Sequence, residues 1–204
     1  RVMSKQGGGN IVNVSSTMGD RGAPNSALYA ASKHAVEGLT KAAALLMDAL
    51  RDREDRLEVA GFDSDGRQAV NYLRLLDFGQ PAPADPATVL GAARPGLSTR
   101  LGAALRHATA RLAKETSAQR TLLVLSDGTP SDIDVFDARH LVEDAARAVV
   151  EARRKGVRCF CLSLDRASEA DVRRIFGHAG YRIVDDPARL AAVLARSYAE
   201  LAGG

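Results

Sequence analysis

The feature that most constrains this fold is an alternation of short apolar runs with longer stretches in which apolar residues recur every three or four positions. Turn residues bound the short runs, as in β-strands, whereas the longer stretches have the period of amphipathic helices. Such alternation favours an α/β sheet with helices on both faces. The predicted strands are residues 10–15, 56–62, 69–76, 121–126, 157–164 and 181–184. The predicted helices are residues 27–50, 99–114, 139–155, 169–176 and 187–201.

The connection between the second and third predicted strands is residues 63–67, Asp-Ser-Asp-Gly-Arg. This segment is too short for the crossover that parallel strands need, and it has the composition of a hairpin turn. One strand is therefore predicted to run antiparallel. Residues 78–96 hold four of the seven prolines and are predicted to form a long surface loop. A length of 204 residues with 46% hydrophobic residues suits one ordinary domain.

Composition excludes several classes of function. The net charge is +3, but arginines alternate with acids instead of forming a basic stripe, so no nucleic-acid binding is expected. No apolar stretch approaches the roughly 20 residues of a membrane span. Cys159 and Cys161 have neither disulfide nor zinc-site spacing and are predicted to be core residues. A reducing, cytoplasmic compartment is the expectation.

Two short segments are similar to the catalytic stretch of the short-chain dehydrogenase/reductase family. They are Gly-Asn-Ile-Val-Asn-Val-Ser-Ser at 9–16 and Tyr-Ala-Ala-Ser-Lys-His-Ala-Val at 29–36. The resemblance implies that Ser16 polarises a substrate carbonyl, that Tyr29 exchanges the proton, and that Lys33 lowers the tyrosine pKa and binds the ribose of NAD(P). Residues four apart lie on one helix face, which suits an ammonium beside a phenolate.

The same family builds its cofactor site from a strand and a Gly-rich turn into a helix, upstream of the serine. Only 15 residues precede Ser16, and the glycines at 7–9 lead into a predicted strand, which offers no helix N-terminus to a pyrophosphate. We therefore expect a relic of the dehydrogenase motif. An NAD(P)-dependent oxidoreductase fragment that lacks its cofactor-binding half is the alternative hypothesis.

A second resemblance covers about residues 44–204 and rests on several motifs in order. They are Gly-Phe-Asp-Ser-Asp-Gly-Arg at 61–67, Asp-Phe at 77–78, Arg-Pro-Gly at 94–96, Thr-Arg-Leu-Gly-Ala-Ala-Leu-Arg-His-Ala at 99–108, Leu-Ser-Asp-Gly-Thr-Pro-Ser-Asp-Ile-Asp at 125–134, Glu-Asp at 143–144 and Arg-Ile-Phe-Gly at 174–177. These motifs resemble von Willebrand factor type A domains, and more narrowly those of nitric-oxide-reductase (NorD) and Rubisco (CbbO) activation proteins.

This resemblance implies a doubly wound, mostly parallel six-stranded sheet with one antiparallel edge strand. It also implies a protein-binding module that is not an enzyme, with a MoxR-type AAA+ ATPase as partner and a metalloenzyme as the target of activation. We expect residues 1–204 to form one type A-like domain. Within it, the dehydrogenase-like residues 1–43 serve as the first strand and helix, and residues 44–204 form the remainder. A recombined or artificial chain with neither parent's activity is a third hypothesis.

Type A domains often carry a metal-ion-dependent adhesion site built from three loops: Asp-x-Ser-x-Ser after the first strand, a Thr before a helix, and an Asp after the fourth strand. Thr99 and Asp127 match the second and third loops. Our own overlay places Asn13, Ser15 and Thr17 on the first. Mg²⁺ or Mn²⁺ accepts such oxygen ligands.

The first loop has Asn13 where the family has an aspartate, so we expect weaker metal binding than at an intact site. Asp132 and Asp134 could compensate for the lost charge, or each could cap the turn that follows. The alternative without metal makes Thr99 a helix N-cap and Asp127-Gly128 a turn.

Overall fold

The computed structural model describes residues 9–16, 56–81, 83, 98–117, 119–126, 129–186 and 189–203, with side chains left out at 9–16, 191 and 201–203. Its strands are β1 (Gly9–Ser16), β2 (Arg56–Ser64), β3 (Val70–Leu76), β4 (Gln119–Ser126), β5 (Val157–Ser163) and β6 (Tyr181–Ile183). Its helices are α3 (Leu101–Leu112), α4 (Arg139–Arg154), α5 (Glu169–Phe176) and α6 (Leu190–Gly203).

All six predicted strands are confirmed with ends within two residues, and the four predicted helices in the described ranges are confirmed within three. The predicted helix 27–50 and most of the predicted loop 78–96 lie outside the described residues. The doubly wound arrangement therefore stays a prediction.

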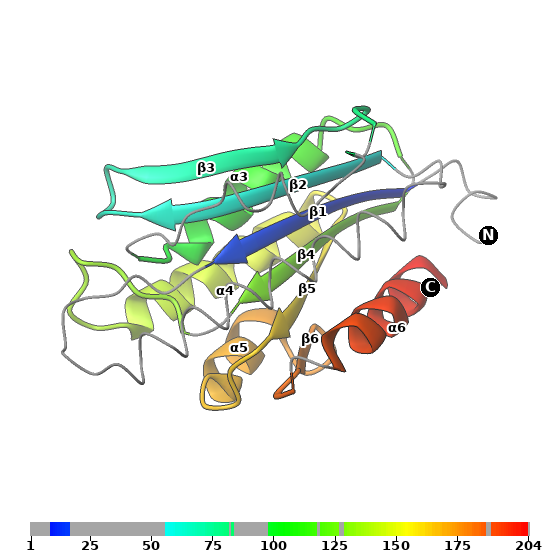
Figure 1. The fold of residues 1–204 in the computed structure, drawn as a ribbon. Coiled ribbons are helices and arrows are strands. Elements are labelled where there is room, and N and C mark those ends of the chain that lie inside the picture. Colours follow the sequence, from blue (N-terminus) through cyan, green and yellow to red (C-terminus); the bar gives the residue numbers. More distant parts are fainter. Residues whose placement is uncertain are drawn as a thin grey trace.

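The strands form one mixed sheet in the order β3-β2-β1-β4-β5-β6 (Figure 1). β3 pairs antiparallel with β2 at the edge, and the other neighbouring strands are parallel. The predicted hairpin is confirmed: the amide of Asp65 donates to the carbonyl of Ala69 at 2.8 Å. Gly66 supplies the positive φ, 78°, that the turn requires.

β1 lies in the interior of the sheet, between β2 and β4. Val12 is in register with Glu58 on one side and Leu122 on the other. The segment that resembles dehydrogenases therefore supplies a strand with hydrogen-bonded neighbours on both edges. Interior parallel strands mainly require apolar, β-branched residues, which the Ile-Val-Asn-Val sequence at 11–14 provides.

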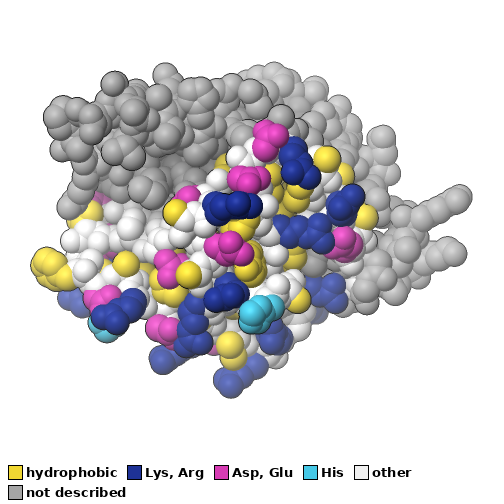
Figure 2. Space-filling model, turned by 90° about the horizontal axis from the view of Figure 1, so that it is seen from below, with side chains coloured by type: hydrophobic (Ala, Val, Ile, Leu, Met, Phe, Trp, Pro, Cys, Tyr) yellow, Lys and Arg dark blue, Asp and Glu magenta, His cyan; other side chains and the backbone are white. Residues whose placement is uncertain are grey.

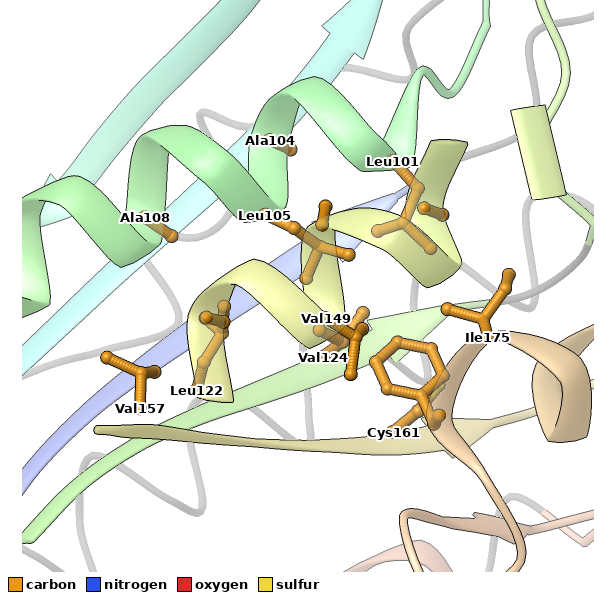
Figure 3. Close-up of a cluster of buried hydrophobic side chains, with 14 of the residues drawn as sticks. Leu101, Ala104, Leu105, Ala108, Leu122, Val124, Val149, Val157, Cys161 and Ile175 are labelled. Atoms are coloured by element: carbon orange, nitrogen blue, oxygen red, sulfur yellow. The ribbon is translucent and has the colours of Figure 1, made fainter. Parts of the chain in front are cut away.

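Two buried clusters cover the two faces of the sheet. On one face, α3, α4 and α5 pack against Leu122 and Val124 of β4 (Figure 3). On the other, Leu123 and Leu125 of the same strand contact a cluster that includes Leu190 of α6. Because successive side chains of a strand point to opposite faces, the continuous apolar run of β4 serves both clusters.

The cysteines lie on the face that α3, α4 and α5 cover. Cys161 is fully buried, and Cys159 packs partly buried against the same cluster. Burial raises the pKa of Cys159 to about 12, so the thiol stays protonated near neutral pH. The predicted core role of both residues is confirmed.

The antiparallel edge hairpin is tied to α3 by a buried carboxylate. Glu58 of β2 is 0% exposed and accepts a hydrogen bond from the Tyr72 hydroxyl at 2.8 Å. Arg111 of α3 pairs with Glu58 and also with Asp77, at 2.6 Å. An unpaired buried carboxylate would be costly, so this contact fixes the position of α3 on the hairpin.

The opposite edge is less completely paired. β6 is in register with Cys161–Ser163 alone, so among the described residues no strand pairs with 157–160 of β5 on that side. Within the same described ranges, no helix is long and apolar enough to cross a membrane.

Candidate functional site

The predicted site lies where β1 and β4 end. Ser15 is in register with Leu125, β1 ends at Ser16 and β4 ends at Ser126, so the two carboxyl ends reach the same edge of the sheet. The chain leaves β1 for β2 on one side and later returns to β4 on the other. This change of direction is the switch point at which open α/β sheets place ligands.

Thr99 joins this edge to the loop that precedes α4. Its amide donates to the carbonyl of Ser131 at 2.8 Å, and its hydroxyl accepts from the Ser131 amide at 3.3 Å. The residue is 4% exposed. The N-cap of α3 is Arg100, without a side-chain cap, so the alternative that Thr99 caps this helix is wrong.

Asp132 is the buried anchor of this loop, with a side chain that is 0% exposed. Its Oδ1 accepts hydrogen bonds from the amides of Gly66 at 2.8 Å and Ile133 at 2.7 Å. Its Oδ2 accepts from Arg100 Nε at 2.8 Å. The loop is thereby joined both to the β2–β3 turn and to the start of α3.

Burial alone would favour the neutral form of Asp132. Hydrogen bonds from Gly66, Ser64, Ile133 and Arg100 outweigh that effect and hold the pKa of Asp132 below its usual value. The side chain is therefore a carboxylate whose lone pairs are already used.

Asp134 has a similar role near the surface. Its Oδ2 accepts from the Arg67 amide at 2.9 Å, and it pairs with Arg100. The two aspartates that could have compensated for Asn13 are thus committed to a cation and to backbone amides of the hairpin. Neither of these two carboxylates is therefore free to replace the charge lost at Asn13.

The loop displays apolar side chains that sequence reasoning missed. Phe136 is 107% exposed and Ile133 is 39% exposed. The available signal was the sequence Ile-Asp-Val-Phe-Asp at 133–137, where apolar residues alternate with acids and no helical period explains them. Large apolar side chains are seldom fully exposed, so Phe136 is a candidate contact residue.

The remaining predicted residues are only partly described. Asn13, Ser15 and Ser16 lie in β1, where Asn13 is level with Val59 and Leu123, inside the ladder and three residues before the strand ends. Outside the described residues lie Thr17, Tyr29, Lys33 and Asp127. That the five predicted metal ligands lie close together therefore stays a prediction. The same holds for Ser16, Tyr29 and Lys33. Among the described side chains, no three His, Cys, Asp or Glu residues gather to hold a metal.

Comparison with known proteins supports the type A resemblance. The chain is 39% identical to Protein NorD of Brucella suis over 149 residues, which are 73% of this chain and 24% of that protein. The chain thus spans about a quarter of the length of this relative. The von Willebrand factor domain of the pilus tip protein Mfa5 from Porphyromonas gingivalis superimposes with a TM-score of 0.68 at 12% identity over 95% of both chains.

A von Willebrand factor type A structure from Catenulispora acidiphila gives a TM-score of 0.64 at 18% identity, over 96% of this chain and 43% of that one. The fold is therefore that of type A domains. The N-terminal resemblance is also confirmed, because residues 1–51 match the short chain dehydrogenase family. A 3beta-hydroxysteroid dehydrogenase of Mediterraneibacter gnavus is 68% identical over 38 residues, which are 19% of this chain and 14% of that enzyme.

Proposed function

We propose that this chain is a type A docking module that binds a protein partner at the carboxyl edge of its sheet. The observation that carries the proposal is Phe136, fully exposed on a loop that buried Asp132 anchors to the hairpin and to α3. Aromatic side chains dominate the binding energy of many interfaces, and a pre-ordered loop loses little conformational entropy on binding.

A divalent cation, Mg²⁺ or Mn²⁺, would assist at the same edge. The donors predicted there are hydroxyl and carboxylate oxygens, which suit a hard cation. Ser15, Thr17, Thr99 and Asp127 are the ligands we favour, since Asn13 lies about 10 Å before the end of β1, at roughly 3.3 Å per residue. When bound, the cation would supply positive charge to an acidic side chain of the partner.

The resemblance to NorD and CbbO activators suggests which partner this is. We take it to be a MoxR-type AAA+ ATPase, through which the module takes part in activating a metalloenzyme such as nitric oxide reductase or Rubisco. In this proposal residues 1–204 act as one domain, with 1–43 in place of the usual first strand and helix.

Binding of a purified MoxR-type ATPase to the immobilised chain tests the docking edge. Phe136→Ser should weaken the Kd at least about tenfold, the effect of a modest hot spot. Leu73→Ser is the matched control, because Leu73 is an apolar side chain 50% exposed on edge strand β3. Equal effects of the two substitutions, or none, would reject the docking edge.

Calorimetric titration with Mn²⁺ tests the cation separately. Heat of binding should disappear in Asp127→Ala and persist in Asp137→Ala, whose carboxylate is paired with Arg139 at the surface. Persistence of the heat in Asp127→Ala would remove the cation from the proposal without affecting the Phe136 contact.

The alternative function is oxidoreduction by Ser16, Tyr29 and Lys33, favoured by the 68% identity to a dehydrogenase over 38 residues. NAD(P) does not fit the described residues well, because Gly9 is the first residue of strand β1, so the glycine run leads into no helix N-terminus. Saturable binding of NADH, followed by nicotinamide fluorescence, would establish the alternative over the docking module.

A further inference from the structure

A hollow lies between α4 and the end of α5, and α4 lines it from Glu143 to Arg154. Its volume is about 590 Å³. Val149, Ile175 and Phe176 are buried and form its apolar floor, while Val150 is 47% exposed at its side. We call this hollow the α4–α5 groove. Val150 is thus the apolar side chain of the groove that is open to solvent.

The acidic residues of the α4–α5 groove are already neutralised within the chain. Glu143 accepts two hydrogen bonds from Arg174, at 2.6 and 2.7 Å. Glu151 accepts from Arg106 at 2.8 Å. Neither carboxylate is therefore available to balance further positive charge.

The groove also contains arginines outside the two ion pairs just described. Arg147, Arg153 and Arg154 line it. Arg153 and Arg154 form no ion pair with a carboxylate in the described part of the chain, and Arg147 lies close enough to Glu143 to help lower the pKa of that carboxyl. Figure 2 views the molecule from the side on which α5 lies in Figure 1, and Lys and Arg side chains gather in the lower part of that face. The groove therefore combines an apolar floor with a surplus of positive charge.

A neighbouring hollow of about 650 Å³ extends the groove around the end of α5 to the open edge of β5. The two hollows share Val149, Arg153, Phe176 and Gly177. Ser197 of α6 lines this neighbouring hollow and is 1% exposed.

We propose that the α4–α5 groove binds an acidic amphipathic segment of a protein partner. Apolar side chains of that segment contact Val150 and the floor, and its carboxylates pair with Arg147, Arg153 and Arg154. The exposed apolar side chain of Val150 favours a peptide over a nucleic acid, because a phosphate backbone has no use for an apolar contact. This surface is distinct from the carboxyl edge, so the module can hold two segments at once.

The test uses the 204-residue chain and a fluorescein-labelled peptide with leucines on one helical face and glutamates on the other. Fluorescence anisotropy should show saturable binding, and a shuffled peptide of the same composition should bind at least about tenfold more weakly. Val150→Asp and the double variant Arg153→Glu/Arg154→Glu should each weaken binding at least about tenfold. Arg196→Glu is the matched control, because Arg196 is an exposed arginine on α6.

Several outcomes would overturn the proposal. Equal binding of the shuffled peptide would show charge attraction alone, and an equal loss in Arg196→Glu would show that the groove is not involved. Binding of duplex DNA or of phosphatidylserine vesicles that needs the arginines, while Val150→Asp leaves peptide binding unchanged, would assign the surface to those ligands. Phe136→Ser and Asp127→Ala should leave peptide binding intact, so failure at one surface is distinguishable from failure at the other.

Discussion

At the scale of single residues, Asp132 contributes most to the geometry of the candidate site. It is a charged side chain with 0% exposure, and its partners come from the hairpin turn, from α3 and from its own loop. A buried charge of this kind is stable only while every partner is present. The loop that carries Phe136 therefore depends on one carboxylate.

Asp132→Asn should destabilise the chain by about 1–3 kcal/mol, because the amide adds a donor where amides and a guanidinium already donate. Urea unfolding followed by circular dichroism measures the change. Asp137→Asn is the matched control, since Asp137 pairs with Arg139 in a solvated contact and should change stability much less than Asp132→Asn does. Equal losses in the two variants would contradict the anchoring role of Asp132.

The pH dependence follows from the same side chain. The pKa of Asp132 is lower in the folded state than in the unfolded state, where it is about 3.9. The ionised side chain therefore contributes to the free energy of unfolding above about pH 3.9, and this contribution is lost as the pH falls through the pKa of the folded state. The stability difference between wild type and Asp132→Asn should therefore be constant near neutrality and shrink below about pH 4. Urea titrations from neutral to acid pH measure it, and a difference that grows on acidification would contradict the assignment.

Residue-scale contacts of this kind could not be predicted from the sequence. The motif at 125–134 drew attention to Asp132, but Gly66 lies 66 positions away and nothing local shows that its amide is the partner. The placement of Thr99 before a helix was predictable, whereas its hydrogen bonds with Ser131 depend on how two distant loops meet. The exposure of Phe136 is likewise a property of the folded surface.

At the scale of elements, the edge hairpin and α3 act as one unit through Glu58 and Arg111. The Glu58 side chain is 0% exposed, so removal of its cation would leave an uncompensated buried charge. Arg111→Met should lower the free energy of unfolding by about 3–5 kcal/mol. Adding Glu58→Gln should restore part of this stability, because the neutral amide needs no cation and its oxygen still accepts the hydrogen bond from Tyr72. Thermal unfolding measures both.

Arg74→Met is the control for that pair, because Arg74 contacts Asp77 from a side chain that is 50% exposed. The Arg74→Met variant should lose less than about 1 kcal/mol of stability, as is usual when a solvated ion pair is removed. A double variant no more stable than Arg111→Met would show that lost packing, and not the buried charge, causes the effect.

The connection from α5 to β6 contains a glycine that is required for close approach. A Cβ on Gly180 would lie 2.2 Å from the carbonyl oxygen of Phe176, a backbone atom that cannot move aside easily. Gly180→Ala should destabilise by about 1–3 kcal/mol in chemical denaturation. Gly61→Ala is the matched control, since a Cβ there meets nothing within 4 Å. Similar losses in both variants would contradict the steric explanation.

Element types and ends were largely predictable because they depend on local periodicity. The apolar run of β4 and the three-and-four spacing of α4 are readable within one window of sequence. The short hairpin connection predicted the antiparallel β3. The requirement for glycine at 180 was not predictable, because it arises from a turn that brings Phe176 back against the chain.

At the scale of the whole molecule, the position of β1 decides whether one sheet forms. β1 pairs with β2 and with β4, so it is the link between the hairpin side and the β4–β5 side. Sequence analysis predicted parts of two families in one chain, and the sheet shows how they combine: the dehydrogenase-like strand takes an interior position. Neither family resemblance alone predicts this position of β1, because β1 comes from the dehydrogenase-like segment and its partners β2 and β4 come from the type A-like segment.

Val12→Pro should therefore unfold the molecule as a unit. The ring removes an amide from a strand paired on both sides, and the expected loss is about 3 kcal/mol or more. Leu73→Pro on β3 should cost less, because β3 is at the edge of the described sheet and pairs there with β2 alone. Amide hydrogen exchange should show that β2, β4 and β5 lose their protection together. A loss of protection confined to β1 would contradict the prediction that the sheet unfolds as one unit.

The short length of β6 has a consequence for the chain at high concentration. β6 pairs with β5 along Cys161–Ser163, so residues 157–160 present strand edge that no described strand covers on that side. An open edge is a template on which a second polypeptide can add by backbone hydrogen bonds, the first step of β-aggregation. Arg158 is exposed within this edge, and a charged side chain on an edge strand opposes pairing with another backbone. The charge of this side chain is thus expected to limit aggregation of the chain at high concentration.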